Sequence, residues 1–426
     1  MLEFDMSASS ITRVTARQLL DARGIPTIES EVHTVKSKAT AMAPSGVTVG
    51  MHECMELRDG GKAYFGKGVK TAIRNVKEVI EPALRGKDAS KQRQIDELLL
   101  KLDGTSNQAK LGGNALVSVS WACARVAAQS LEIPLFEHIG KLFGNSKPLL
   151  PVPSFTMING GRHAGNAIEF QEFLVLPTHA ASFSESIQMG CEIYQNLQVM
   201  VRDKFGKQYA HTGYTGGLAP PFTKNEDAIK LISHAIKQLG YEKRAKIAIH
   251  AAAGSTHKAG RYKIDGMEWM GERMVQYYSD ITARYPIAYI TDPFYGEDWG
   301  NFVSLTKELN GKTKVFGDEL TASNVDRSMR ALKLKACDGI ALKPNQVATL
   351  STALDAAKFA LSNDLKVIVV HRAGETEDNF ITDLSVGIAN GIIQCGAPAR
   401  GERTSKYNQL LRIEEMLGSK AKMASW

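Results

Sequence analysis

The chain has 426 residues, of which 43% are hydrophobic and 23% charged, the composition of a folded globular protein. That length exceeds what one hydrophobic core usually organises, so we expect two domains. The formal net charge is +7, but the 52 lysines and arginines are spread along the chain without a dense run. This even spacing argues against nucleic-acid binding through bulk charge.

The cysteines and the apolar runs indicate a soluble protein of the cytoplasm. Five cysteines are widely spaced and include no CxxC pair, which is typical of reduced core residues. No apolar run approaches the length of a membrane span, and the N-terminus lacks the basic-then-apolar order of a signal peptide. We therefore expect no membrane association. Residues 1–10 are predicted to be a flexible extension, in which Met6 offers a second possible start beside Met1.

The region 11–145 is predicted to form an α+β domain. Two runs with β-type alternation, 11–17 and 27–33, flank a turn-like segment and indicate a small antiparallel meander. Helical spacing then takes over at 69–80, 92–102 and 114–129. A segment rich in turn residues near 144–148 separates this domain from the rest of the chain.

The region 146–426 is predicted to form a (β/α)8 TIM barrel. It contains eight short β-type runs, at 152–158, 172–176, 246–251, 288–293, 314–320, 339–343, 367–371 and 392–396. From the third run onward each gap holds a helical pattern, as a parallel barrel requires. The first gap, 159–171, is too short for a crossover helix, and the second has room for two helices. The order is therefore ββαα(βα)6, with an antiparallel strand pair in an otherwise parallel barrel.

Charged side chains follow several of the predicted strands. His371 ends the run 367–371 and Arg372 follows it, Lys343 ends the run 339–343, and Asp318 ends the segment Lys314-Val-Phe-Gly-Asp318. The carboxyl ends of barrel strands form the face that carries chemistry. The cationic side chains there predict an anion-binding site.

Several runs, taken together and in order, resemble the enolase (phosphopyruvate hydratase) family. The runs are Asp21-Ala-Arg-Gly-Ile-Pro-Thr27, Leu102-Asp-Gly-Thr105, Asn159-Gly-Gly-Arg-His-Ala-Gly165, Gln171-Glu-Phe173, Asp292-Pro-Phe294, His371-Arg-Ala-Gly-Glu-Thr-Glu-Asp378, Gly396-Ala-Pro398 and Asn408-Gln-Leu-Leu-Arg-Ile-Glu-Glu415. The resemblance implies an enolase-type barrel behind an α+β N-terminal domain. It also implies a lyase of glycolysis that dehydrates 2-phosphoglycerate to phosphoenolpyruvate with Mg²⁺ on the enolate.

At the metal-binding positions implied by the resemblance, this chain lacks two of the family's three carboxylates. Enolases have carboxylates at three strand ends, where this chain has His250, Thr291 and Asp318. Asp292 is expected not to replace the second carboxylate, because consecutive residues of a strand point to opposite faces. One carboxylate does not hold Mg²⁺ firmly. Zn²⁺ on His250 and Asp318 is the alternative, but a third ligand is not apparent from the sequence.

The acid and base positions are also altered. The resemblance assigns the general base to Lys343, which is present. Gln394 stands where enolases have a second lysine, and Thr215 stands where they have the acid that acts on the leaving hydroxyl. Glu172 matches a further catalytic position. Alternatively, Lys343 is only a charge at the barrel rim and Glu172 only its salt-bridge partner. Tyr214 and Thr215 stand where enolases have an Asp-Glu pair, and Tyr214 could fill the pocket that this pair leaves.

The remaining positions implied by the resemblance are mostly polar. His163 matches a catalytic position, and His371 and Arg372 match substrate-binding ones. Ala373 replaces a substrate-binding serine, and Thr48 stands where enolases have a serine linked to the second metal. We expect these residues to give weak binding of phosphorylated anions.

The sequence therefore predicts an enolase-like pseudoenzyme with a structural or partner-binding role and without a cofactor. It would form a homodimer or assemble with another protein, such as an active enolase. The alternative is a weak or altered enolase that uses Lys343 as base and Mg²⁺ as cofactor. A nucleic-acid binder has only the basic composition in its favour.

Overall fold

The computed structural model describes residues 7–47 and 50–426. Thr48 and most of the predicted N-terminal extension, with its two possible starts, lie outside the described residues. The chain divides into two compact units. We call them the N-terminal unit (Met1–Pro148, Lys343–Lys358 and Arg372–Ala389) and the barrel unit (Leu149–Leu342, Phe359–His371 and Asn390–Trp426).

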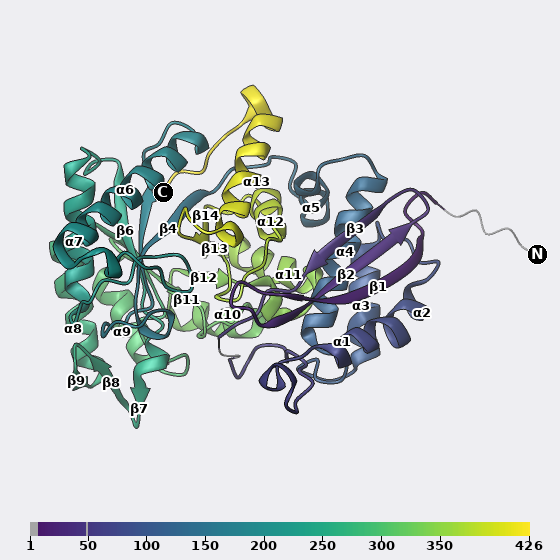
Figure 1. Cartoon of the computed structure of the whole chain (residues 1–426), viewed down its shortest axis with the longest axis horizontal. Helices are drawn as coiled ribbons and strands as arrows, with labels where there is room; N and C mark the ends of the chain where they lie inside the picture. The colour runs from purple at the N-terminus through teal and green to yellow at the C-terminus, as the bar shows by residue number, and fades with distance from the viewer. Residues whose placement is uncertain (1–6, 48–49) are drawn as a thin grey trace, which may run out of the picture. The chain divides into compact units, whose positions relative to one another are not determined.

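The N-terminal unit is built on an antiparallel meander, as predicted. Its strands are β1 (Ile11–Leu20), β2 (Pro26–Thr34) and β3 (Lys38–Met42), paired in that order. Helix α4 (Gly113–Ser130), rich in small residues, packs on β2 and β3 (Figure 1). A buried hydrogen bond of 2.7 Å joins the hydroxyl oxygens of Ser30 and Ser118 across this contact.

Two segments from the C-terminal half of the chain complete this unit. Helix α12 (Phe380–Ile388) packs on α5 (Leu135–Phe143), and the ring of Phe380 stacks on that of Trp121 with centroids 4.5 Å apart. The other helices of the unit are α1 (Lys70–Asn75), α2 (Glu81–Leu84) and α3 (Gln92–Asp103), with a π turn at Val76–Ile80. Its core is therefore made by residues that lie far apart in sequence.

The barrel unit contains a closed barrel of eight strands in the order β10-β11-β12-β13-β14-β4-β5-β6. They are β4 (Val152–Asn159), β5 (Glu172–Pro177), β6 (Ala245–His250), β10 (Ile287–Thr291), β11 (Lys314–Gly317), β12 (Gly339–Leu342), β13 (Lys366–Val370) and β14 (Ile392–Gly396). Strand β5 is antiparallel to both β4 and β6, and the other neighbours are parallel. This confirms the predicted fold class and its exceptional second strand.

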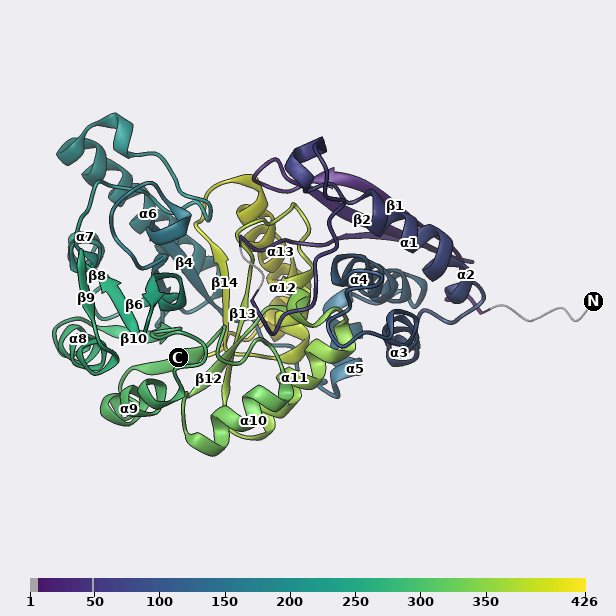
Figure 2. The ribbon, with the colours of Figure 1, turned by 90° about the horizontal axis from the view of Figure 1, so that it is seen from below.

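Helices alternate with the strands of the barrel (Figure 2). They are α6 (Phe183–Phe205), α7 (Asn225–Gln238), α8 (Gly271–Arg284), α9 (Trp299–Leu309), α10 (Val325–Leu334) and α13 (Gly401–Leu417). After β12 and β13 the chain forms α11 (Leu350–Ser362), whose residues up to Lys358 belong to the N-terminal unit, and α12, which belongs to that unit entirely. A small sheet of β7 (His257–Lys258), β8 (Arg261–Ile264) and β9 (Met267–Trp269), which the sequence did not predict, precedes α8. No helix in the described residues is long and apolar enough to span a bilayer.

Apolar side chains fill one end of the barrel, where the last residues of the chain cover them. Leu174, Tyr289 and Phe316 belong to this buried cluster, which also includes Ala424. The ring of Trp426 lies 5.9 Å from that of Tyr289. Because side chains close this end, polar side chains can gather only at the opposite ends of the strands.

Two strands end two or three residues earlier than the sequence predicted, and the earlier end of β10 decides where the Asp292 carboxylate lies. Strand β10 ends at Thr291 and β11 at Gly317, whereas the predicted strands ran to residues 293 and 320. Asp292 has φ of 45°, in the left-handed region that aspartate tolerates better than most residues. The alternation of a strand therefore does not extend to Asp292.

Candidate functional site

The buried carboxylate of Glu172 is the centre of the polar side chains at the mouth of the barrel. Glu172 is the first residue of β5, and it pairs with Asn159 at the end of β4 and with His250 at the end of β6. Because β5 is antiparallel, its first residue lies where its neighbours end. The exceptional strand direction thus brings Glu172 to the carboxyl-end face.

Four side chains surround the Glu172 carboxylate, and we call the five residues the Glu172 network. Thr156 donates its hydroxyl proton to one oxygen, and Gln394 Nε2 donates to the same oxygen at 3.2 Å. His163 Nδ1 lies 3.4 Å and His371 Nε2 3.6 Å from the other oxygen. Burial alone would raise the pKa of Glu172, but hydrogen bonds from the two histidines hold that pKa well below its ordinary value. The carboxylate is therefore ionised and enclosed by donors.

Arg403, which sequence reasoning missed, fixes the proton of His371. Its buried guanidinium donates through Nη1 to His371 Nδ1 at 2.6 Å, so the His371 proton is on Nε2 and faces Glu172. The approach of Arg403 depends on Gly396, which has φ of +93°, and a Cβ at that position would lie 2.8 Å from Arg403 Cδ. No local pattern in the sequence marks Arg403, because its role arises only when α13 packs back on the barrel.

Thr215 and Gln394 are buried and take part in hydrogen bonds. Thr215 Oγ1 accepts a hydrogen bond of 2.7 Å from Asn159 Nδ2. Gln394 Nε2 lies 3.5 Å from His250 Nδ1 as well as near Glu172. The side chain of Tyr214 is 43% exposed, so it does not fill a buried pocket as the sequence had suggested.

A second group, the His250 cluster, lies at the ends of β6, β10 and β11 and comprises His250, Thr291, Asp292 and Asp318. His250 Nε2 is 3.3 Å from Asp318 Oδ2. Candidate ligand atoms of His250, Asp292 and Asp318 all lie within 4.8 Å of one another. The expectation that Asp292 points away from this site was wrong, because Asp292 lies beyond the end of β10 in a left-handed conformation.

Both oxygens of Asp292 accept backbone hydrogen bonds, at 2.8 Å from the N–H of Asp318 and 2.7 Å from that of Glu319. Burial raises the pKa of Asp292 well above its ordinary value, and the negative charge of Asp318 adds to the shift. Thr291 Oγ1 is buried and has no hydrogen-bond partner in the part of the chain that the structure describes. The cluster therefore combines crowded carboxylates with an unsatisfied hydroxyl group.

The predicted anion-binding residue Arg372 is paired with a carboxylate inside the N-terminal unit. Arg372 Nη1 lies 2.8 Å from Glu53 Oε2, and both side chains are largely buried. Arg372 N–H donates to Glu375 Oε1 at 2.9 Å. Ala373, next in the chain, is also buried. Glu53 is a partner that sequence reasoning missed, because no periodic pattern links a loop residue to a residue more than three hundred positions away.

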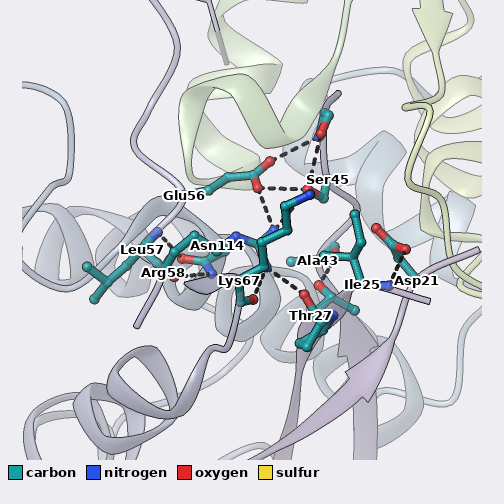
Figure 3. A network of polar contacts seen from close by, with 12 residues as sticks. Asp21, Ile25, Thr27, Ala43, Ser45, Glu56, Leu57, Arg58, Lys67 and Asn114 are labelled. Carbon is teal, nitrogen blue, oxygen red and sulfur yellow. Dashed lines mark hydrogen bonds and ion pairs between the residues drawn. The ribbon is translucent and has the colours of Figure 1, made fainter. Parts of the chain in front are cut away.

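Lys343 and the segment before Thr48 also lie in the N-terminal unit. Lys343 follows β12 directly, is half-buried, and precedes the 3₁₀ turn Pro344–Val347. Ser45 Oγ donates to Glu56 Oε2 at 2.7 Å, and Arg58 Nη2 donates to the same carboxylate oxygen at 2.8 Å (Figure 3). Burial would raise the pKa of Glu56, but the charges of Arg58 and Arg372 hold that pKa below its ordinary value. An ionic network thus holds Ser45 in the N-terminal unit.

Comparison with known proteins identifies the family. Residues 147–426 match the family model of the enolase C-terminal TIM barrel domain, and residues 11–139 match that of the enolase N-terminal domain. The chain belongs to the enolase family. It is 44% identical to the enolase of Methanocaldococcus jannaschii over 96% of both chains. It is 45% identical to the enolase of Pyrococcus furiosus over 96% of this chain and 95% of that one.

The His250 cluster does not fit the Mg²⁺ ion that enolases use. Magnesium prefers an octahedral set of oxygen ligands, usually ionised carboxylates and waters. Here one candidate ligand is an imidazole, and the Asp292 carboxylate is occupied by two backbone N–H groups. Only Asp318 offers a carboxylate of the kind that the family position requires. The cluster therefore lacks the set of ionised carboxylates that a magnesium site of the family has.

Proposed function

We propose that this enolase-family chain lacks 2-phosphoglycerate dehydratase activity and has a structural or partner-binding role. One observation carries the proposal: Thr215 and Gln394, at the positions of the family's acid and second lysine, are buried uncharged side chains, hydrogen-bonded to Asn159 and to the Glu172 carboxylate respectively. A threonine hydroxyl does not donate a proton to a leaving group at neutral pH. An amide does not neutralise a substrate carboxylate.

The energetic argument rests on the charge that develops during dehydration. Removing a proton beside a carboxylate produces a multiply charged enolate, which requires cations opposite it. Loss of a single stabilising group of this kind raises the activation free energy by about 2.7–4 kcal/mol. The changes at His250, Thr291, Thr215 and Gln394 together erase a useful rate even though such losses are not additive.

An assay of the purified chain with 2-phosphoglycerate and excess Mg²⁺ tests the proposal. We expect no phosphoenolpyruvate above a buffer control, whereas an active enolase run in parallel turns over normally. A rate within about a hundredfold of ordinary enzymes would overturn the proposal. The quadruple variant His250→Asp, Thr291→Glu, Thr215→Glu, Gln394→Lys restores the family's charges, and its first detectable turnover would assign the loss to these positions.

A weak or altered enolase is the second candidate. The family positions Lys343, Glu172, His163, His371 and Arg372 are retained, and Glu172 is ionised and buried. These residues would suit proton transfer on a related phosphorylated acid. Mass-spectrometric screening of phosphorylated hydroxy acids, with Lys343→Ala as control, discriminates the candidates. A Lys343-dependent product would favour the enzyme, and its absence favours the binding role.

The partner is part of the proposal: a second copy of this chain or another protein such as an active enolase, in the cytoplasm. Size-exclusion chromatography with light scattering, of the chain alone and mixed with an active enolase, tests the assembly. We expect a homodimer or a mixed complex. A monomer in both samples would contradict this part of the proposal.

Weak binding of phosphorylated anions is also proposed, and the ion pair between Arg372 and Glu53 limits it. An anion has to compete with the Glu53 carboxylate for the guanidinium, so we expect a dissociation constant for inorganic phosphate of roughly millimolar. Glu53→Gln removes the competing charge and should tighten binding several-fold, whereas Arg372→Ala should abolish it. Titration calorimetry measures all three proteins. Equal binding by wild type and Arg372→Ala would contradict the assignment of Arg372.

A further inference from the structure

We propose that the groove between α6 and α7, in the barrel unit, binds a linear amphipathic carboxylate such as a medium-chain fatty acid. The two helices pack side by side, and the groove between them has a volume of about 830 Å³ (Figure 1). That volume lies within the range of about 300–1,000 Å³ that is typical of small-molecule sites. The inference goes beyond the proposed function, because the residues of the groove are distinct from the Glu172 network, the His250 cluster and Arg372.

The groove exists because a long segment, and not a tight turn, joins the two helices. Helix α6 ends at Phe205, and Gly206, with φ of +100°, turns the chain away from the helix axis. The chain returns to α7 through Pro220 and Pro221, which have no N–H to donate, and places Phe222 against the end of α6. The rings of Phe205 and Phe222 meet edge to face with centroids 5.5 Å apart. These two rings line the groove at the end near this segment.

The apolar part of the lining is elongated. Met200 of α6 and Leu231 of α7 line the groove beside the two phenylalanine rings, and both side chains are only partly buried. On α7 the lining residues recur on one face of the helix, and those from Asp227 to His234 span roughly 10 Å at the helical rise. An extended alkyl chain advances by less than one C–C bond of about 1.5 Å per carbon, so about eight carbons fit this length. Contact with the apolar side chains would remove such a chain from water.

The charges on the lining favour an anion at the end near the two rings. Both carboxylates of the lining have cationic partners: Asp203 lies 3.2 Å from the arginine before it in α6, and Asp227 lies 3.8 Å from Lys230. Lys230 is shared with Glu226, at 3.3 Å. Lys204 has no acidic partner among the described residues, and its ammonium lies over the ring of the next residue, 5.1 Å from the centroid. A carboxylate at the mouth of the groove would pair with Lys204.

Polar side chains at the opposite end limit the length of the ligand. His234 and Gln238 line the groove beyond Leu231, and Gln238 Oε1 accepts a hydrogen bond of 3.1 Å from Asn196 Nδ2. An alkyl chain that reached this end would take polar groups out of water without giving them new hydrogen bonds, which costs free energy. The affinity should therefore rise with chain length up to about eight carbons and then level off.

Titration calorimetry of the full chain tests the inference, with sodium hexanoate, octanoate and dodecanoate and with 1-octanol as probes. We expect octanoate to bind with a dissociation constant of about 1 mM or below, and hexanoate to bind roughly tenfold more weakly. Dodecanoate should bind at most about threefold more tightly than octanoate, because its last carbons meet polar side chains. The uncharged 1-octanol should bind about threefold more weakly than octanoate. No octanoate binding at about ten times the expected constant, equal binding of 1-octanol, or an affinity that keeps rising steeply to dodecanoate would overturn the inference.

Variants of the lining place the ligand in the groove. Lys204→Met should weaken octanoate binding to the level of 1-octanol, whereas Lys207→Met, which removes an exposed lysine outside the lining, should leave it unchanged. Leu231→Trp fills the groove and should weaken the binding of octanoate and 1-octanol more than about fivefold. Circular dichroism checks each fold, and Met200→Trp fills the groove from α6 if Leu231→Trp misfolds.

Two results would refute the site. One is an equal octanoate affinity of wild type and Lys204→Met. The other is displacement of octanoate by inorganic phosphate, because the phosphate site proposed at Arg372 uses other residues. The octanoate titration is independent of turnover and of phosphate binding, so this inference and the proposed function can fail separately.

Discussion

The Glu172 network and the His250 cluster are both buried at the mouth of the barrel, but they satisfy their charges differently. Glu172 is a single carboxylate enclosed by hydrogen-bond donors from four side chains. The His250 cluster has two carboxylates that share one imidazole and a hydroxyl without a partner among the described residues. In the first group the carboxylate faces donors, although His163 Nδ1 and Gln394 Oε1 have no hydrogen-bond partner among the described residues. In the second group the atom without such a partner is a hydroxyl beside two carboxylates. The two groups therefore differ in how closely donors surround their carboxylates.

The largest effect is expected when the central charge of the Glu172 network is removed. Glu172→Gln leaves donors from His163, His371 and Gln394 facing a neutral amide, and the free energy of unfolding should fall by about 3 kcal/mol. Urea denaturation monitored by circular dichroism measures the loss. Glu132→Gln, a change at an exposed carboxylate, serves as the control and should have no measurable effect. Equal stabilities of wild type and Glu172→Gln would mean that the network does not hold the charge.

The contribution of Glu172 to stability should also depend on pH. The pKa of Glu172 is lowered in the folded chain, so its contribution to stability is fully present above the unfolded pKa of about 4.3. That contribution is lost as the pH falls through the lower folded pKa. The stability difference between wild type and Glu172→Gln should thus be constant from pH 7 to about pH 5 and shrink below about pH 4. A difference that grows on acidification would contradict the ionised state.

A matched pair of threonine substitutions should give smaller effects of opposite sign. Thr215→Val removes the acceptor of a 2.7 Å hydrogen bond from Asn159 and should lower the free energy of unfolding by about 1–2 kcal/mol. Thr291→Val removes a buried hydroxyl without a partner among the described residues. In chelator-treated protein this change should raise the free energy of unfolding by about 0.5–1 kcal/mol. Urea denaturation measures both. If Thr291→Val is also destabilising, the hydroxyl already has a bound water or ion.

The smallest effect is expected from Mg²⁺ itself. A ligand that binds only the folded state stabilises it by RT ln(1 + [L]/Kd), which is nearly zero when the concentration lies well below Kd. We expect the melting temperature to be unchanged by a few millimolar Mg²⁺, as differential scanning fluorimetry can measure. A rise of several degrees would mean that other ligands complete a magnesium site in the His250 cluster.

The barrel topology could be predicted because it depends on local patterns. Branched apolar runs marked the strands, and the short segment between β4 and β5 left room only for an antiparallel connection. The direction of the Asp292 side chain could not be predicted, because it depends on β10 ending two residues earlier than predicted and on a left-handed backbone at Asp292. Periodicity has no signal for a single residue that leaves a strand.

Partners that are distant in the sequence were also beyond prediction. Arg403 reaches His371 from α13, and Glu53 reaches Arg372 from a loop of the N-terminal unit. Each pair forms only after the fold has brought the segments together. The candidate site was therefore predicted as a set of positions in the chain. The hydrogen bonds that hold those positions required the structure.

The division of the N-terminal unit along the chain has a consequence for biosynthesis. The meander and its first helices are synthesised early, but Phe380, which stacks on Trp121, and Asp378, which pairs with Arg125 at 2.6 Å, belong to a late segment. At about 5–20 residues per second, roughly ten to fifty seconds of translation separate the two parts. During that interval the apolar surface around Trp121 stays uncovered on the ribosome, so this unit should be the chaperone-dependent part of the nascent chain.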